Sequence, residues 1–203
     1  MMREKISKIL PIIGICCGMP ILSPESVAPK GTSQIPVSEP LFIKVFENAC
    51  REITCMYISE QVEEDLKRCI IMYSLQHNEM VTNDIAKKLK ETIRSTIRKT
   101  PETMHLEDSA LNAVTNAQAT LSMIENFRSV CQSITPASNR REVGEKLKNL
   151  LVEHGELTND TAQTLTSIAE KTFTSSDLIP FKTVTLDAII NARVELSRKA
   201  KAL

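Results

Sequence analysis

The sequence has little of what builds turn-rich or aromatic folds. Its 203 residues include five glycines and no tryptophan, and aromatic residues make up only 3%. A β-sandwich, with its many turns and aromatic core, is therefore disfavoured. Basic and acidic residues balance at 25 each, which argues against a strongly basic nucleic-acid-binding protein. With 42% apolar residues, the composition argues against intrinsic disorder and predicts an aliphatic core.

The spacings typical of catalytic and metal sites are also missing. None of the three histidines, His77, His105 and His154, stands at a zinc-site or catalytic-triad spacing from Cys, Asp, Glu or Ser. His77 and His154 fall near predicted helix C-termini, where the helix dipole favours an imidazolium. We therefore expect no metal and no cofactor, and we predict that the protein is not an enzyme.

The cysteines do not form a disulfide framework. Two of the six, Cys16 and Cys17, lie in an apolar segment near the N-terminus. The remaining four are Cys50, Cys55, Cys69 and Cys131. We expect these four to be buried as small apolar residues. A single disulfide, such as one from Cys131 to an earlier helix, is the alternative.

The N-terminus resembles a secretory signal peptide. Arg3, Lys5 and Lys8 precede an uncharged run over residues 9–24. A basic start followed by a short apolar run is typical of export signals. We therefore predict a signal peptide or apolar leader over 1–23 and an exported protein, periplasmic or extracellular. The alternatives are an uncleaved membrane anchor, or a cytoplasmic protein whose first residues happen to be apolar.

A linker is predicted between this leader and the folded part. Residues 24–40 are rich in Pro, with Ser, Thr and Gly between the prolines. Such a composition favours extended chain over helix or strand. We therefore place the folded domain at 41–203.

Helical periodicity dominates that domain, and no segment of useful length alternates as a strand does. The protein is therefore predicted to be all-α, with about seven helices. Their predicted ranges are 38–58, 59–78, 82–100, 108–134, 140–153, 158–171 and 184–199.

An internal repeat is the most informative feature. The twelve residues from Leu111 to Ser122 recur from Leu186 to Ser197 with six identities, and a fainter copy runs from Ile43 to Thr54. We call this segment the A motif. Self-similarity of this kind is the mark of repeated structural units.

A second motif repeats as well, at Thr82-Asn83-Asp84 and at residues 158–160. Both copies are typical helix starts, with Thr as the cap and Asp near the positive end of the helix dipole. The order of motifs predicts two similar three-helix units, 41–107 and 108–183, and a closing helix over 184–203. A short α-superhelix or a pseudo-symmetric bundle fits this organisation.

Residues 144–171 resemble the antiparallel helix pairs of HEAT and armadillo-type solenoids. The likeness lies in Leu147, Leu150 and Leu151, a short turn, Asn159-Asp160 and a second apolar stripe. The resemblance implies a binding scaffold, in which asparagines lining a groove grip a peptide backbone.

Three asparagines at equivalent positions of the A motif are candidates for that role: Asn48, Asn116 and Asn191. On a helical wheel Asn116 falls opposite the apolar stripe. An amide offers a peptide both a donor and an acceptor. The structural alternative is that each asparagine bonds a neighbouring loop.

One predicted helix, 83–99, is locally basic. Its candidate anion-binding residues are Lys87, Lys90, Arg94 and Arg98. They favour nucleic acid or an anionic membrane surface as ligand, although the helix has no aromatic residue to stack on bases. Two functions therefore stand at this point. The first is binding of a protein or peptide through the repeated helices, and the second is binding of an anionic polymer or membrane through the basic helix.

Overall fold

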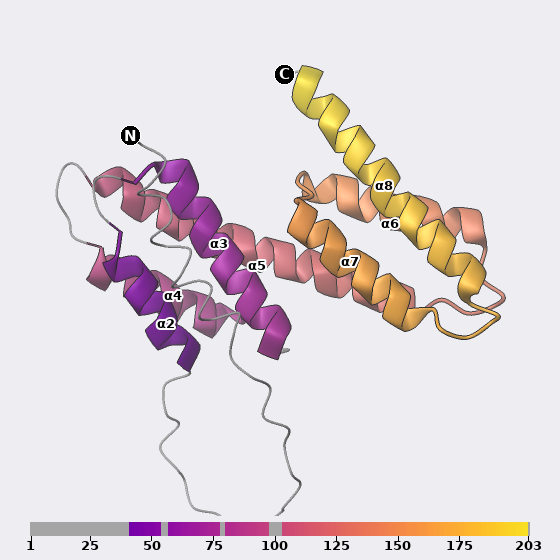
Figure 1. Ribbon diagram of the computed structural model, residues 1–203, viewed down its shortest axis with the longest axis horizontal. Coiled ribbons are helices and arrows are strands. Elements are labelled where there is room, and N and C mark those ends of the chain that lie inside the picture. Colours follow the sequence, from indigo (N-terminus) through magenta and orange to yellow (C-terminus); the bar gives the residue numbers. More distant parts are fainter. Residues whose placement is uncertain (1–40, 54–56, 78–79, 98–102, 203) are drawn as a thin grey trace, which may run out of the picture. The chain divides into compact units, whose positions relative to one another are not determined.

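The computed structural model describes residues 41–53, 57–77, 80–97 and 103–202 and is all-α, as predicted (Figure 1). These residues form seven helices and no strand. The helices are α2 (Leu41–Arg51), α3 (Ser59–His77), α4 (Asn83–Thr96), α5 (Met104–Gln132), α6 (Arg140–His154), α7 (Asn159–Thr172) and α8 (Ile179–Ala202). The predicted leader, the predicted linker, Cys55 and Arg98 lie outside the described residues.

Two predicted helix ends are too late. Helix α2 stops at Arg51 instead of residue 58, and α4 stops at Thr96 instead of residue 100. The end of α4 is rich in side chains that compete with the helix, since the Thr92 and Ser95 hydroxyls bond backbone carbonyls of the preceding turn. Ile97 is already extended, with φ −70° and ψ 122°.

Two predicted helix starts are also too late. Helix α5 begins at Met104 instead of residue 108, and α8 begins at Ile179 instead of residue 184. Pro180 lies in the first turn of α8, where its missing N–H costs no hydrogen bond because first-turn donors have no helical acceptor. Proline thus marks the beginning of this helix.

The first compact unit ends at Gln118 and contains α2, α3, α4 and the first part of α5. Helix α2 packs on both α3 and α4. Phe46, Ile70 and Leu89 are fully buried in the core of this unit. An aromatic stack joins α2 to α3, with the ring of Tyr73 centred 4.1 Å from Phe42 and 4.3 Å from His77.

The second unit begins at Ala119 and contains the rest of α5 together with α6, α7 and α8. Helix α8 packs on α6 and α7 (Figure 1). Leu147, Leu165 and Phe181 are buried in this unit. Gly144 lets α6 and α8 approach closely, because a Cβ at that position would lie 3.1 Å from Val184 Cγ1. The unit boundary falls within α5, eleven residues after the predicted one at 107.

The ends of α6 follow the expected chemistry. The side-chain oxygen of Asn139 accepts from the backbone N–H groups of Arg141 and Glu142. At the other end Gly155 takes the left-handed conformation with φ 85°, which glycine adopts without a Cβ clash.

Three of the cysteines are buried free thiols, namely Cys50, Cys69 and Cys131. Burial raises the pKa of the Cys50 thiol to about 12, and the nearby Glu47 carboxylate acts in the same direction. Burial alone raises the pKa of Cys131 to about 12. For these three residues, the expectation of small apolar core side chains agrees with the structure. Within the described ranges, no helix is long and apolar enough to cross a membrane.

Candidate protein-docking surface

The two Thr-Asn-Asp segments are helix N-caps, as predicted. Thr82 and Thr158 have nearly the same extended backbone, with φ −63° and −67° and ψ 165° and 163°. Each hydroxyl accepts the N–H three residues on, at 3.3 Å from Ile85 N and 3.2 Å from Thr161 N. Capping satisfies a first-turn donor and accounts for the threonine.

The asparagine of each segment makes a contact that the sequence did not predict. Asn83 Oδ1 accepts from Gln118 Nε2 at 2.9 Å, and Asn159 Oδ1 accepts from the Arg193 guanidinium. Gln118 and Arg193 both occupy the eighth position of the A motif. Each unit therefore ties its A motif to the first turn of the preceding helix. The common position was visible in the sequence, but the pairing was not.

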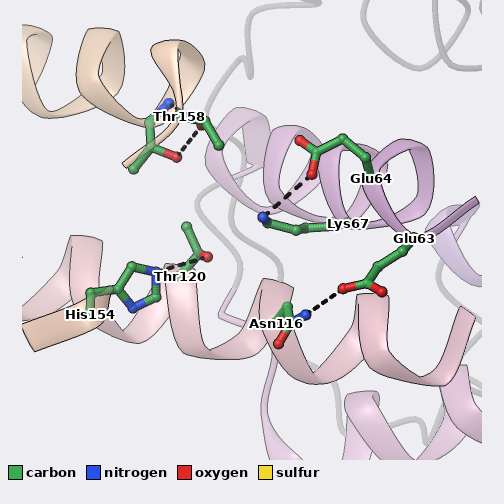
Figure 2. A network of polar contacts seen from close by, with 8 residues as sticks. Glu63, Glu64, Lys67, Asn116, Thr120, His154 and Thr158 are labelled. Carbon is green, nitrogen blue, oxygen red and sulfur yellow. Dashed lines mark hydrogen bonds and ion pairs between the residues drawn. The ribbon is translucent and has the colours of Figure 1, made fainter. Parts of the chain in front are cut away.

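Asn116, one of the three asparagines predicted to bind a partner, already has a partner within the chain. Its Nδ2 donates to Glu63 Oε1 on α3 at 2.6 Å (Figure 2). The contact joins α5 to α3 inside the first unit. This geometry is the structural alternative that the sequence left open, with a neighbouring helix in place of a loop.

The other two asparagines differ from Asn116. Asn48 is exposed on α2, and Asn191 is exposed on α8 at the edge of a groove that α8 forms with α6. Arg140, Lys148 and Val184 also line this groove. Within the part of the chain that the structure describes, the side chains of Asn48 and Asn191 make no hydrogen bond. Partner binding by Asn48 and Asn191 stays a prediction.

Two of the three histidines make contacts within the chain. His154 Nε2 lies 3.3 Å from Thr120 Oγ1 and holds the end of α6 against α5 in the second unit (Figure 2). His77 stacks on Tyr73. Among the described residues there is no cluster of His, Cys, Asp or Glu suited to a metal ion.

The cations predicted on the basic helix do not share one environment. Lys87 and Arg94 are exposed on α4, whereas Lys90 is half-buried. No large apolar side chain on α4 is exposed. The described part of this helix thus offers cations without an apolar contact surface.

Helix α8 exposes two aliphatic side chains that line one surface depression. Ile190 and Val194, one turn apart on its solvent side, are 59% and 45% exposed. They lie in a surface depression lined by Ile190, Arg193, Val194, Ser197, Arg198 and Lys201. We call these six residues the α8 stripe. It combines two aliphatic side chains with three cations and has no carboxylate.

The acidic residue of α8 next to the stripe, Glu195, is already ion-paired. Glu195 forms ion pairs with Lys148 of α6 at 2.8 Å and with Lys199 at 3.4 Å. A hydrogen bond from Lys148 is the main cause that lowers the pKa of Glu195. Both ion-pair partners of this carboxylate lie outside the stripe.

The equivalent positions of α5 provide an internal reference. In the A motif of α5, Thr115 stands where α8 has Ile190, and Ala119 stands where it has Val194. All four positions are exposed. The apolar character of the α8 stripe is therefore not a requirement of the helix or of the repeat.

No protein-family model, curated protein or solved structure matches this chain. The surface of the chain is therefore the guide to its function.

Proposed function

We propose that the protein is a non-enzymatic interaction protein that binds a protein partner through its second unit, with the α8 stripe as the contact. The observation that carries this proposal is the exposure of Ile190 and Val194, one turn apart, on a helix whose inward face is already packed. Single exposed apolar residues are common, but a pair that lines one depression is typical of interaction sites. Asn191, on the adjoining side of α8, adds a donor and an acceptor at the edge of the same surface.

Burial of the pair supplies the driving force. Covering a largely exposed aliphatic side chain contributes on the order of 1 kcal/mol. Two such residues, with the polar atoms around them, suit a specific interface of modest affinity. The alternative ligands, nucleic acid or an anionic membrane at helix 83–99, stay a prediction supported by the exposed Lys87 and Arg94.

The test transplants the α5 surface onto α8. The double variant Ile190→Thr, Val194→Ala carries the α5 residues at both positions, and because both side chains are exposed, its helix content and stability should be unchanged. Proteins captured by the full chain from a lysate are purified, and their binding is measured by titration calorimetry. We expect the variant to bind at least about tenfold more weakly, the equivalent of about 1.4 kcal/mol.

A matched control removes an exposed isoleucine of the first unit. Ile58 is 64% exposed and precedes α3. Ile58→Thr should leave binding unchanged. Captured partners that bind the double variant as tightly as the original chain would refute the proposed function.

A further inference from the structure

We infer that the α8 stripe receives an acidic amphipathic helix of the partner protein, an inference that rests on the proposed function. Three cations, Arg193, Arg198 and Lys201, border the aliphatic pair, and no carboxylate stands among them. An interface of this sign selects a partner with carboxylates around an apolar centre, because complementary charge favours association and like charge opposes it. The cations thus select for the partner's charge, and the aliphatic pair selects for an apolar anchor residue on the partner.

The comparison with α5 strengthens the charge argument. Where α8 has Lys201, the equivalent α5 residue is the exposed but neutral Asn126, and where α8 has Arg193, α5 has the neutral Gln118. Arg193 keeps the tie to Asn159 that Gln118 makes to Asn83, so its positive charge is not needed for the fold. The stripe is therefore basic beyond what the repeat requires.

The shape of the stripe favours a helix as the ligand. Ile190 and Val194 are four residues apart, and Ser197 and Lys201 continue the same row. A straight row of this kind packs against the apolar residues of a second helix, which recur at three- and four-residue spacing. The opposite face of α8 is buried through Ala188, Ile189 and Ala192, so the helix is held in place to receive a ligand.

The same features disfavour other occupants. A symmetric contact with a second copy would place one basic stripe on another, since both copies use the same patch. A lipid surface needs a wide apolar face, and besides Ile179 in its first turn α8 exposes only this short aliphatic row among its large apolar residues. Phosphate backbones gain nothing from two aliphatic side chains at the centre of the contact.

The experiment selects peptides by charge. A displayed library of helical peptides, each of about 18 residues or five turns, carries two leucines four residues apart and random Glu, Lys or Gln around them. It is selected on the full chain at physiological ionic strength and counter-selected on the variant Ile190→Thr, Val194→Ala. We expect the enriched peptides to be acidic, and their binding to weaken steeply as salt rises.

Charge reversal tests the cause directly. The variant Arg198→Glu, Lys201→Glu should bind the enriched acidic peptides at least about tenfold more weakly and should enrich Lys-rich peptides instead. The control Lys146→Glu, Lys171→Glu reverses one exposed cation of α6 and one of α7, neither of which lines the stripe or the groove, and should bind as the original chain does. Circular dichroism checks that both variants are folded.

Neutral or basic enriched peptides, or no enrichment over the counter-selected variant, would overturn the inference. The inference would also be overturned by either of two results that disappear when the stripe is substituted. One is self-association of the chain in sedimentation experiments, and the other is its binding to phosphatidylserine vesicles or single-stranded DNA. In all these cases the proposed function stands if captured proteins still depend on Ile190 and Val194. The proposed function fails together with the inference only if the binding of captured proteins does not depend on Ile190 and Val194.

Discussion

Helices α5 and α8 carry the same twelve-residue motif, yet they present different surfaces to solvent. Several inward positions keep their size and burial, as at Ala117 and Ala192, which are both fully buried. Outward positions have changed from Thr115 and Ala119 to Ile190 and Val194. Packing limits the volume of a buried side chain, while an exposed position is constrained only by what touches it. The difference thus separates residues that build the fold from residues that are available for a partner.

The two copies also differ in how they use the same asparagine. Asn116 bonds Glu63 within the chain, whereas Asn191 is exposed beside a groove and makes no hydrogen bond within the described residues. The same side chain therefore has a structural role in the first unit and is available to a ligand in the second.

The largest expected effect concerns the buried thiols, which report on each unit separately. Cys50 lies in the first unit and Cys131 in the second, and both have a pKa raised by burial from 9.0 to about 12. At pH 8 this shift alone lowers the thiolate fraction, and with it the alkylation rate, about a thousandfold relative to the unfolded chain. The rate should rise as the pH approaches 12.

Iodoacetamide labelling, localised by mass spectrometry along a urea gradient, measures both sites in one sample. Different urea midpoints for Cys50 and Cys131 would show that the units unfold separately, and coincident midpoints that they unfold together. Labelling of Cys50 in the absence of urea at the unfolded rate would contradict its burial.

The next largest effect is expected from removing the leucine at the eleventh position of the A motif, in α5 or in α8. Leu121 in α5 is 3% exposed, and its counterpart Leu196 in α8 is half-buried. Leu121→Ala should lower the free energy of unfolding by about 2–5 kcal/mol, because it leaves a cavity. Leu196→Ala should cost about 1 kcal/mol, since less area is involved. Urea denaturation followed by circular dichroism measures both, and equal losses would argue against the difference in burial.

The smallest expected effect is at the helix caps. Thr158 bonds both the backbone of Thr161 and its hydroxyl, at 2.9 Å, and is partly buried, whereas Thr82 is exposed. Thr82→Ala should cost about 1 kcal/mol of stability. Thr158→Ala should cost more, because the hydroxyl of the buried Thr161 also loses its partner. Thermal unfolding of the two variants compares them, and Thr→Ser at either site should restore most of the loss.

Much of the fold was predictable because it depends on local chemistry. Helical periodicity predicted seven helices, and Thr82 and Thr158 correctly marked the starts of α4 and α7. The errors lie at the ends of α2 and α4 and at the starts of α5 and α8. At α4 the Thr92 and Ser95 hydroxyls bond the backbone, and at α8 Pro180 lies in the first turn. Sequence periodicity alone does not predict these effects on helix ends.

The candidate site was harder to predict. Periodicity placed Asn116 correctly on the outer side of its helix, but only tertiary structure brings Glu63 to it. The α8 stripe was not predicted although its signal was present in the sequence. A repeat is recognised by what its copies share, whereas the stripe lies where Ile190 and Val194 differ from their counterparts.

The duplication also has a consequence for the order of folding. Gln118 and Arg193 belong to copies of one motif, so an unfolded chain risks pairing either A motif with either asparagine, Asn83 or Asn159. All residues of the first unit precede Ala119, and at roughly 5–20 residues per second a growing chain contains them several seconds before α8 is finished. Helical units with local contacts fold in milliseconds or less. Because the chain is synthesised from its N-terminus, Asn83 can bond Gln118 before Arg193 has been made. The direction of synthesis therefore protects the repeat from mispairing.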